Sequence, residues 1–136
     1  MAKKSHILVA EDNPADIYLI QEALREHGVD CDVLVLKDGA EALQYVSQFD
    51  KDHTTFCPEL FILDLHLPKH DGEEVLALLR SSERCGKVPV IVMSSSDAPS
   101  HQNIADRHES VQYFRKPRDL SQFMEIGTIV RTFFPH

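Results

Sequence analysis

Short apolar runs alternate along the chain with stretches in which apolar residues recur every three or four positions. Short continuous runs are typical of buried strands, whereas the three-to-four spacing is typical of helices with one apolar face. The runs predict five strands, at His6–Ala10, Asp32–Lys37, Glu59–Leu63, Lys87–Met93 and Val111–Arg115.

Cap and turn residues indicate where the helices between these strands begin and end. Asn13 and Pro14 predict the start of the first helix, and Gly28 predicts its end. The segment that Asp97 and Pro99 open has few apolar residues and predicts only a weak helix. The other apolar helix faces comprise Ile17, Ile20 and Leu24; Leu43, Val46 and Phe49; Val75, Leu78 and Leu79; and Leu120, Phe123, Met124, Ile126, Val130 and Phe134.

This alternation is typical of a parallel sheet with helices on both of its faces. We therefore expect an α/β fold in which a doubly wound, five-stranded parallel sheet is flanked by five helices. A chain of 136 residues is expected to form one domain. In such sheets, reactive groups and ligands gather at the carboxyl ends of the strands.

Composition excludes several classes of function. The 22 acidic and 14 basic side chains give a net charge of −8, which disfavours binding to the phosphate backbone of nucleic acids. No apolar run approaches the ~20 residues that a membrane span requires. Three cysteines (Cys31, Cys57 and Cys85) without a C-x-x-C motif argue against a disulfide framework or a zinc site. We therefore expect reduced cysteines and a cytoplasmic location.

Polar residues follow four of the predicted strands. Glu11 and Asp12 follow the first, Asp64 the third, Ser94 the fourth and Lys116 the fifth. Gathered at one edge, three carboxylates would repel each other unless a cation such as Mg²⁺ lay between them. An ammonium and a hydroxyl beside one carboxylate would stabilise a phosphoryl group bound there. Each residue alone also suits a helix start or a turn, but their joint placement favours a site.

With these residues identified, the chain resembles the receiver domain of two-component response regulators over nearly its whole length. The resemblance implies a flavodoxin-like sheet of strand order 2-1-3-4-5, and one receiver domain spanning residues 1–136 with no output domain. The motifs that carry it are Glu11-Asp12, Asp64 within ILDLHLPKHDG, Ser94 after PVIVM, and Lys116-Pro117.

The resemblance also implies a role for each residue. Asp64 would accept a phosphoryl group, and Ser94 and Lys116 would contact its oxygens. Tyr113 would act with Ser94 as a switch. The imidazole of His66, an uncommon residue at this position, is expected to alter the rate of dephosphorylation. The implied ligands of Mg²⁺, or of Mn²⁺ in its place, are Glu11, Asp12, Asp64 and the backbone carbonyl of His66.

The implied partners are a sensor histidine kinase or phosphotransfer protein and a downstream target protein. The segment Asn13–Asp16 and the long loop before Phe56 resemble small regulators that pair with phytochrome-type histidine kinases. Comparable regulators can dimerise through the last helix, so a homodimer is a further expectation. We expect no nucleic acid, no membrane, and no enzyme activity beyond the chain's own phosphotransfer and dephosphorylation.

Three other functions share part of this pattern. A receiver-like interaction module that is never phosphorylated would not need the complete acidic and lysine set. A Mg²⁺-dependent aspartyl-phosphate phosphatase would want a second aspartate where His66 stands. A flavin mononucleotide module would want a phosphate-binding loop after the first strand, where Glu11 and Asp12 repel phosphate.

Overall fold

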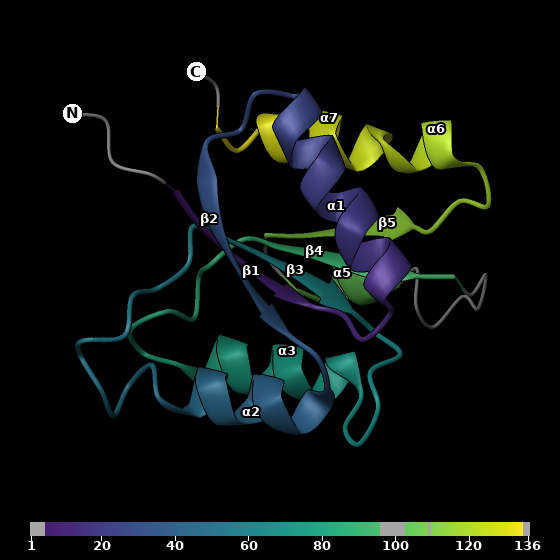
Figure 1. Ribbon diagram of the computed structural model, residues 1–136. Helices are drawn as coiled ribbons and strands as arrows, with labels where there is room; N and C mark the ends of the chain where they lie inside the picture. The colour runs from purple at the N-terminus through teal and green to yellow at the C-terminus, as the bar shows by residue number, and fades with distance from the viewer. Residues whose placement is uncertain (1–4, 96–102, 109, 135–136) are drawn as a thin grey trace.

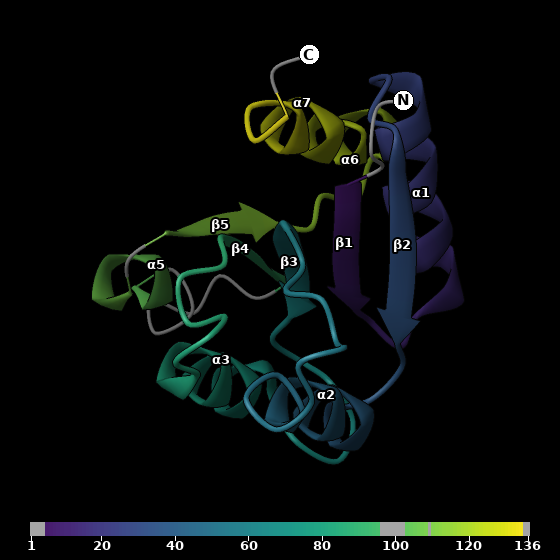
Figure 2. The same ribbon diagram turned by 90° about the vertical axis from the view of Figure 1, so that its left-hand side faces the viewer.

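A five-stranded parallel sheet forms the centre of the molecule in a computed structural model, which describes residues 5–95, 103–108 and 110–134. Adjacent strands are parallel, in the order β2-β1-β3-β4-β5 that the resemblance implied. Figures 1 and 2 show the sheet from two directions. The strands are β1 (Ser5–Ala10), β2 (Cys31–Leu36), β3 (Leu60–Asp64), β4 (Val90–Ser94) and β5 (Val111–Arg115).

Helices cover both faces of the sheet, as the alternating pattern predicted. Helices α1, α6 and α7 lie on one face, and α2 and α3 lie on the other (Figure 1). Alternate residues of β1 therefore face two different cores: Ile7 and Val9 pack on the first side, Leu8 and Ala10 on the second. Among the described residues, no helix has the length and apolar character needed to cross a membrane. The bounds are α1 (Pro14–Glu26), α2 (Gly39–Ser47), α3 (Gly72–Ser81), α5 (Ile104–Arg107), α6 (Leu120–Phe123) and α7 (Glu125–Arg131).

Side-chain caps fix the helix starts at the carboxyl edge of the sheet. The Asn13 side chain accepts hydrogen bonds from the backbone N–H groups of Ala15 and Asp16, which starts α1 immediately after β1. Asp38 and Asp71 cap α2 and α3 in the same way. The first turns of these helices are therefore held close to the strand ends.

The carboxyl-terminal helix differs from the single helix that the apolar pattern predicted. It is broken at Met124, because the N–H of Gly127 donates to the carbonyl three residues earlier. Gly127 also allows α7 to approach α1 closely, since a Cβ there would lie 2.7 Å from the Ala23 carbonyl oxygen. Leu120 is largely exposed and does not join the core. The start of the predicted weak helix, at Asp97 and Pro99, lies outside the described residues.

The expectation of reduced cysteines was wrong for one pair. Cys57 and Cys85 form a disulfide, with Cα atoms 5.5 Å apart, whereas Cys31 is a free thiol. The loop before β3 and the segment after α3 lie side by side, and Asp50 accepts a hydrogen bond from the Ser82 hydroxyl across this contact. The 28-residue separation of the two cysteines gave no indication of this proximity. Cysteine chemistry therefore no longer supports a cytoplasmic location.

Reducing this disulfide is expected to lower the free energy of unfolding by roughly 2–4 kcal/mol, because the crosslink restricts the unfolded chain. Urea unfolding with and without a reductant measures the change. The Cys31→Ser variant is the control and should keep the full effect of the reductant, whereas Cys85→Ser should lose it. Identical unfolding midpoints for the wild type under both conditions would contradict the prediction.

Candidate functional site

Four strand ends bring the sequence-predicted residues together at the carboxyl edge of the sheet. Glu11 follows β1, Asp64 is the last residue of β3, Ser94 is the last residue of β4, and Lys116 follows β5. The Lys116 N–H donates to the Ser94 carbonyl oxygen at 2.9 Å, so the backbone of the lysine is fixed against β4. Asp12 follows Glu11 and is exposed. The sequence therefore identified these five residues and their common location.

The Lys116 ammonium is the centre of this arrangement. Its Nζ lies 2.7 Å from Glu11 Oε2, 2.8 Å from Asp16 Oδ2 and 2.9 Å from Asp64 Oδ2. Only 13% of the lysine side chain is exposed. Burial by itself would lower the pKa of Lys116, but the three carboxylates outweigh it and raise that pKa above its usual value. The lysine therefore stays charged.

Asp16 belongs to the site, although sequence reasoning did not assign it there. It lies in the first turn of α1, four residues beyond Asp12, and so it does not follow a strand directly. The Asn13 cap directs this turn along the carboxyl edge, which brings the Asp16 carboxylate to Lys116. An acidic residue in the first turn of a helix that starts directly at the site was the available signal.

Asp64 is held from two sides. Its Oδ1 accepts a hydrogen bond from the His66 N–H at 2.9 Å, and its Oδ2 accepts one from Lys116. Gly72, at the start of α3, packs against the end of β3 so closely that a Cβ there would lie 2.6 Å from the Asp64 carbonyl oxygen. Both carboxylate oxygens of this buried aspartate therefore have defined partners and a defined orientation.

Glu11 is fully buried at the end of β1. Burial is the main cause that raises the pKa of Glu11 to about 7, and the charge of Asp64 acts in the same direction. The hydrogen bond from Lys116 offsets part of this increase. At neutral pH this carboxyl is consequently poised between its protonated and charged forms.

The acidic residues fit a hard divalent cation. Carboxylate oxygens of Glu11, Asp12 and Asp64 all lie within 4.8 Å of one another. Glu11 Oε2 is a buried oxygen whose close neighbour is the Lys116 ammonium, 2.7 Å away. A buried acceptor beside two further carboxylates suits an oxygen-preferring ion. The donor set of the sequence prediction is thus assembled, and the backbone carbonyl of His66 as a ligand stays a prediction.

Ser94 has a partner that the sequence did not indicate. Its hydroxyl is fully buried and lies 3.2 Å from His66 Nε2. The imidazole of His66 therefore reaches the site through this serine, and its effect on the rate of dephosphorylation stays a prediction. Tyr113 is half-buried on β5 and pairs in register with Val92, two residues before Ser94. Its role in a switch stays a prediction.

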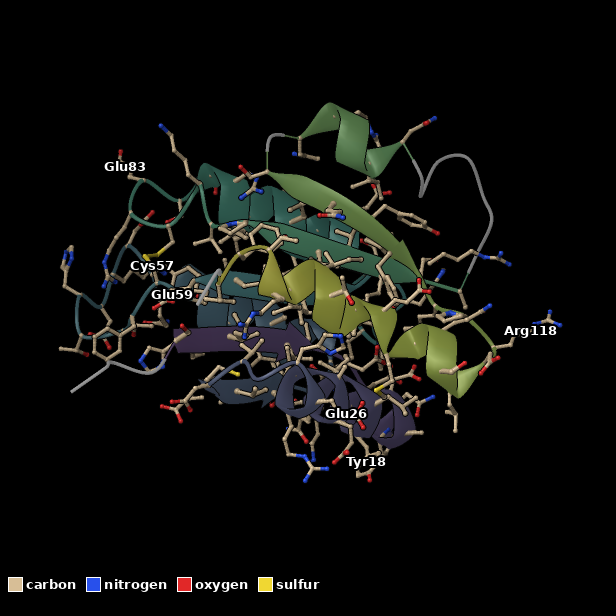
Figure 3. The ribbon with its side chains drawn as sticks, turned by 90° about the horizontal axis from the view of Figure 1, so that it is seen from above. Tyr18, Glu26, Cys57, Glu59, Glu83 and Arg118 are labelled. Carbon is tan, nitrogen blue, oxygen red and sulfur yellow. A yellow bond between two sulfur atoms is a disulfide. The ribbon has the colours of Figure 1, made fainter. Side chains whose placement is uncertain are left out.

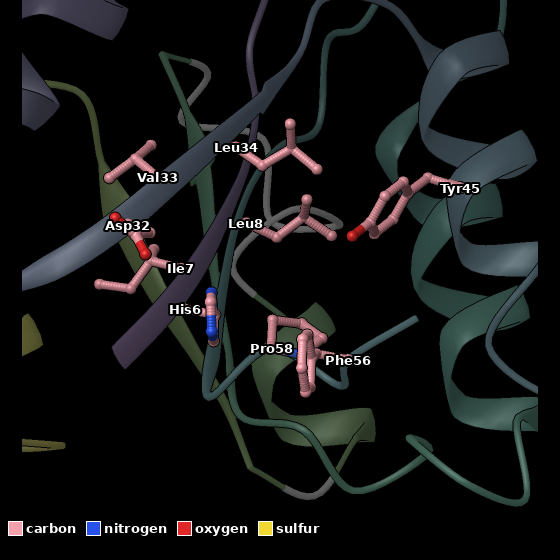
Figure 4. A pocket seen from close by; sticks show the side chains of 9 residues that line it. All are labelled: His6, Ile7, Leu8, Asp32, Val33, Leu34, Tyr45, Phe56 and Pro58. Atoms are coloured by element: carbon pink, nitrogen blue, oxygen red, sulfur yellow. The ribbon is translucent and has the colours of Figure 1, made fainter. Parts of the chain in front are cut away.

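A separate hollow of about 160 Å³ lies beside β1 and β2, and Figure 4 shows that it is largely apolar. It contains none of the residues of the carboxyl-edge site. The rings of His6 and Phe56 stack beside it, with centroids 5.3 Å apart. Its lining residues are His6, Ile7, Leu8, Asp32, Val33, Leu34, Tyr45, Phe56 and Pro58.

Comparisons with known proteins agree with the fold and with the arrangement of the residues at the carboxyl edge of the sheet. The response regulator receiver domain family matches residues 7–127. The response regulator Rcp1 of Synechocystis sp. is 30% identical over 128 residues, which cover 94% of this chain and 87% of Rcp1. Its Mn²⁺-bound crystal structure has a TM-score of 0.81 at 30% identity, covering 96% of this chain and 94% of that one.

The phosphorylated cyanobacterial phytochrome response regulator RcpA is also similar, with 38% identity and a TM-score of 0.82. The alignment covers 98% of this chain and 95% of RcpA. The family match, the relatives and the sheet order agree with the grouping of acids and lysine at the strand ends. The chain belongs to the response regulator receiver domain family and is a protein of two-component signalling.

Proposed function

We propose that the chain accepts a phosphoryl group on Asp64 and thereby switches its contacts with other proteins. The observation that carries this proposal is the pairing of buried Asp64 with Lys116 beside two further acids at one sheet edge. A carboxylate held in this way suits a nucleophile that forms an acyl phosphate. The phosphorylated state of the similar regulator RcpA supports the same chemistry.

The donor is a phosphohistidine of a sensor histidine kinase or of a phosphotransfer protein. A carboxylate oxygen of Asp64 forms a bond to phosphorus as the bond between phosphorus and the imidazole nitrogen breaks. Lys116, already 2.9 Å from Asp64, neutralises charge on the transferred group. The Ser94 hydroxyl, which lies 3.2 Å from His66 Nε2, donates to a second phosphoryl oxygen.

Glu11, Asp12 and Asp64, with the backbone carbonyl of His66, are the residues that would hold Mg²⁺ or Mn²⁺. When bound, the ion supplies positive charge that offsets the charge on the phosphoryl oxygens. The Mn²⁺-bound form of the similar regulator Rcp1 supports the binding of a divalent ion by this chain. The residues of this chain supply the orientation, since Glu11 and Asp64 are buried and fixed by neighbours.

The output is protein contact by one receiver domain spanning residues 1–136. Ser94 and Tyr113 would couple phosphorylation to the surface near β5, since the two residues lie on the paired strands β4 and β5. Similarity to phytochrome response regulators favours a phytochrome-type kinase as the partner. A cytoplasmic location and a homodimer through α7 belong to the same proposal, without nucleic acid or membrane as partners.

An enzyme acting on separate substrates is the less favoured alternative. A phosphatase of the aspartyl-phosphate type would use a second carboxylate two residues after Asp64, and His66 occupies that position. The His66 ring instead contacts Ser94. The chain is therefore proposed to catalyse only its own phosphotransfer and dephosphorylation, and an unphosphorylated interaction module would not need the buried acids.

The Asp64→Asn variant is expected to lose phosphorylation entirely, because an amide cannot form an acyl phosphate. Intact-protein mass spectrometry after incubation with acetyl phosphate and Mg²⁺ should show one phosphoryl group on the wild type and none on the variant. Asp52→Asn, an exposed loop aspartate, is the matched control and should react like the wild type. An adduct that survives Asp64→Asn would overturn the proposal, and many turnovers of a phosphomonoester would favour the phosphatase.

Stabilisation by Mg²⁺ is expected to depend on pH through Glu11. Its folded-state pKa of about 7 exceeds the ordinary 4.5, so its contribution to stability is complete below 4.5 and is lost as pH rises through about 7. An added cation must displace this proton at low pH and finds the carboxylate already charged at high pH.

Mg²⁺ should therefore raise the melting temperature more near pH 8 than near pH 6. Thermal unfolding with and without Mg²⁺ at both pH values measures the difference. Glu11→Gln, which cannot titrate, should show little difference between them. An equal or larger increase at the lower pH in the wild type would contradict the prediction.

A further inference from the structure

Of the three carboxylates that touch Lys116, Asp16 is the one outside the proposed reaction. Asp64 is the proposed acceptor, and Glu11 belongs to the acidic cluster that fits a cation. Asp16 comes from helix α1, and its Oδ2 accepts a hydrogen bond from Lys116 Nζ at 2.8 Å. The two side chains are only 18% and 13% exposed, so solvent screens this pair weakly.

Phosphorylation changes the partners of this ammonium. An ammonium has three N–H donors, and here three carboxylate oxygens lie within 2.9 Å of it. When Asp64 carries a phosphoryl group and Glu11 faces a cation, two of these partners are altered. Asp16 is the partner that remains in place.

The helical turn that carries Asp16 is held rigidly in place. The Asn13 side chain accepts from the Asp16 N–H, and Pro14 begins the helix, so the first turn of α1 has a fixed start. A lysine side chain has a flexible four-carbon stem, and holding its end in one place costs conformational entropy. Because the Asp16 carboxylate lies on a fixed helical turn, it already holds the end of the lysine side chain in place before phosphotransfer begins. The entropy of the side chain is therefore lost on folding and not during the reaction.

We propose that Asp16 is a positioning residue that holds the Lys116 ammonium against the acceptor before, during and after phosphotransfer. The proposal rests on the proposed function of Asp64 and adds a residue to it. The alternative is a purely structural ion pair that ties α1 to the segment after β5. These two roles differ in what they do to the reaction rate of a folded protein.

The Asp16→Asn variant separates the two roles, because it keeps the size of the side chain and removes its charge. The maximal rate of Asp64 phosphorylation at saturating acetyl phosphate and Mg²⁺ should fall roughly tenfold, the order expected for one lost charge-assisted hydrogen bond. The Mg²⁺ dissociation constant should change by less than about threefold, since Asp16 is not in the acidic cluster that fits the cation.

Two further variants complete the experiment. Glu22→Gln removes the same charge from the same helix, where Glu22 pairs with Arg25 at the surface, and should leave the rate unchanged. Asp16→Glu keeps the charge but moves it by one methylene, so its rate should lie several-fold below the wild type and above Asp16→Asn. If Asp16→Asn fails to fold, the comparison of Asp16→Glu with the wild type decides the question.

Each outcome has one meaning. A lowered melting temperature with an unchanged maximal rate in both Asp16 variants would overturn the positioning role and leave a structural pair. A faster rate in Asp16→Asn would also overturn it, because Asp16 would then withhold Lys116 from the acceptor. If the wild type itself forms no adduct, the proposed function of Asp64 fails and not only the role of Asp16.

Discussion

The carboxyl edge of the sheet depends on one buried ammonium shared by three carboxylates. A charge removed from water is tolerated only when it is paired and hydrogen-bonded, so Lys116 and its acids must be assembled together. The sheet order provides this assembly, since β3 lies between β1 and β4 and places Asp64 centrally. A change of strand order would leave Glu11, Asp64 or Lys116 buried without its partner.

The same arrangement leaves a deficit of positive charge. Lys116 is one cation among Glu11, Asp12, Asp16 and Asp64, and the pKa of Glu11 shows the consequence, since burial and Asp64 together raise it to about 7. The fold thus maintains a site in which acids are held closer than they would lie in water. Such a site gains from any added positive charge, and that gain links cation binding to the stability of the fold.

The periodicity of the sequence predicted the features that depend on local pattern, namely the strands and the residues at their ends. Parallel strands must end at one edge, so the residues at the end of each apolar run, Glu11, Asp64, Ser94 and Lys116, could be placed together from the pattern alone. The position of Asp16 depends on the direction in which the first turn of α1 points, which local pattern does not define. The Cys57–Cys85 disulfide depends on contact between two loops, and spacing along the chain does not reveal it. The break at Met124 likewise lies beside a contact between distant segments, since Gly127 packs closely against α1.

Different interactions hold the two ends of the sheet together. At the amino end, a disulfide, the Asp50 carboxylate and the Arg80 guanidinium join neighbouring loops, and Arg80 Nη1 donates to the Gly86 and Val88 carbonyls. Figure 3 shows Cys57 at this end and Arg118 at the other. At the carboxyl end, charged groups are held by partners that a new phosphoryl group would compete for. Bonds that join loops at one end resist opening, whereas ion pairs at the other end can exchange partners and so allow a second arrangement. A signal that enters at Asp64 is therefore expected to rearrange the carboxyl end while the amino end keeps its structure.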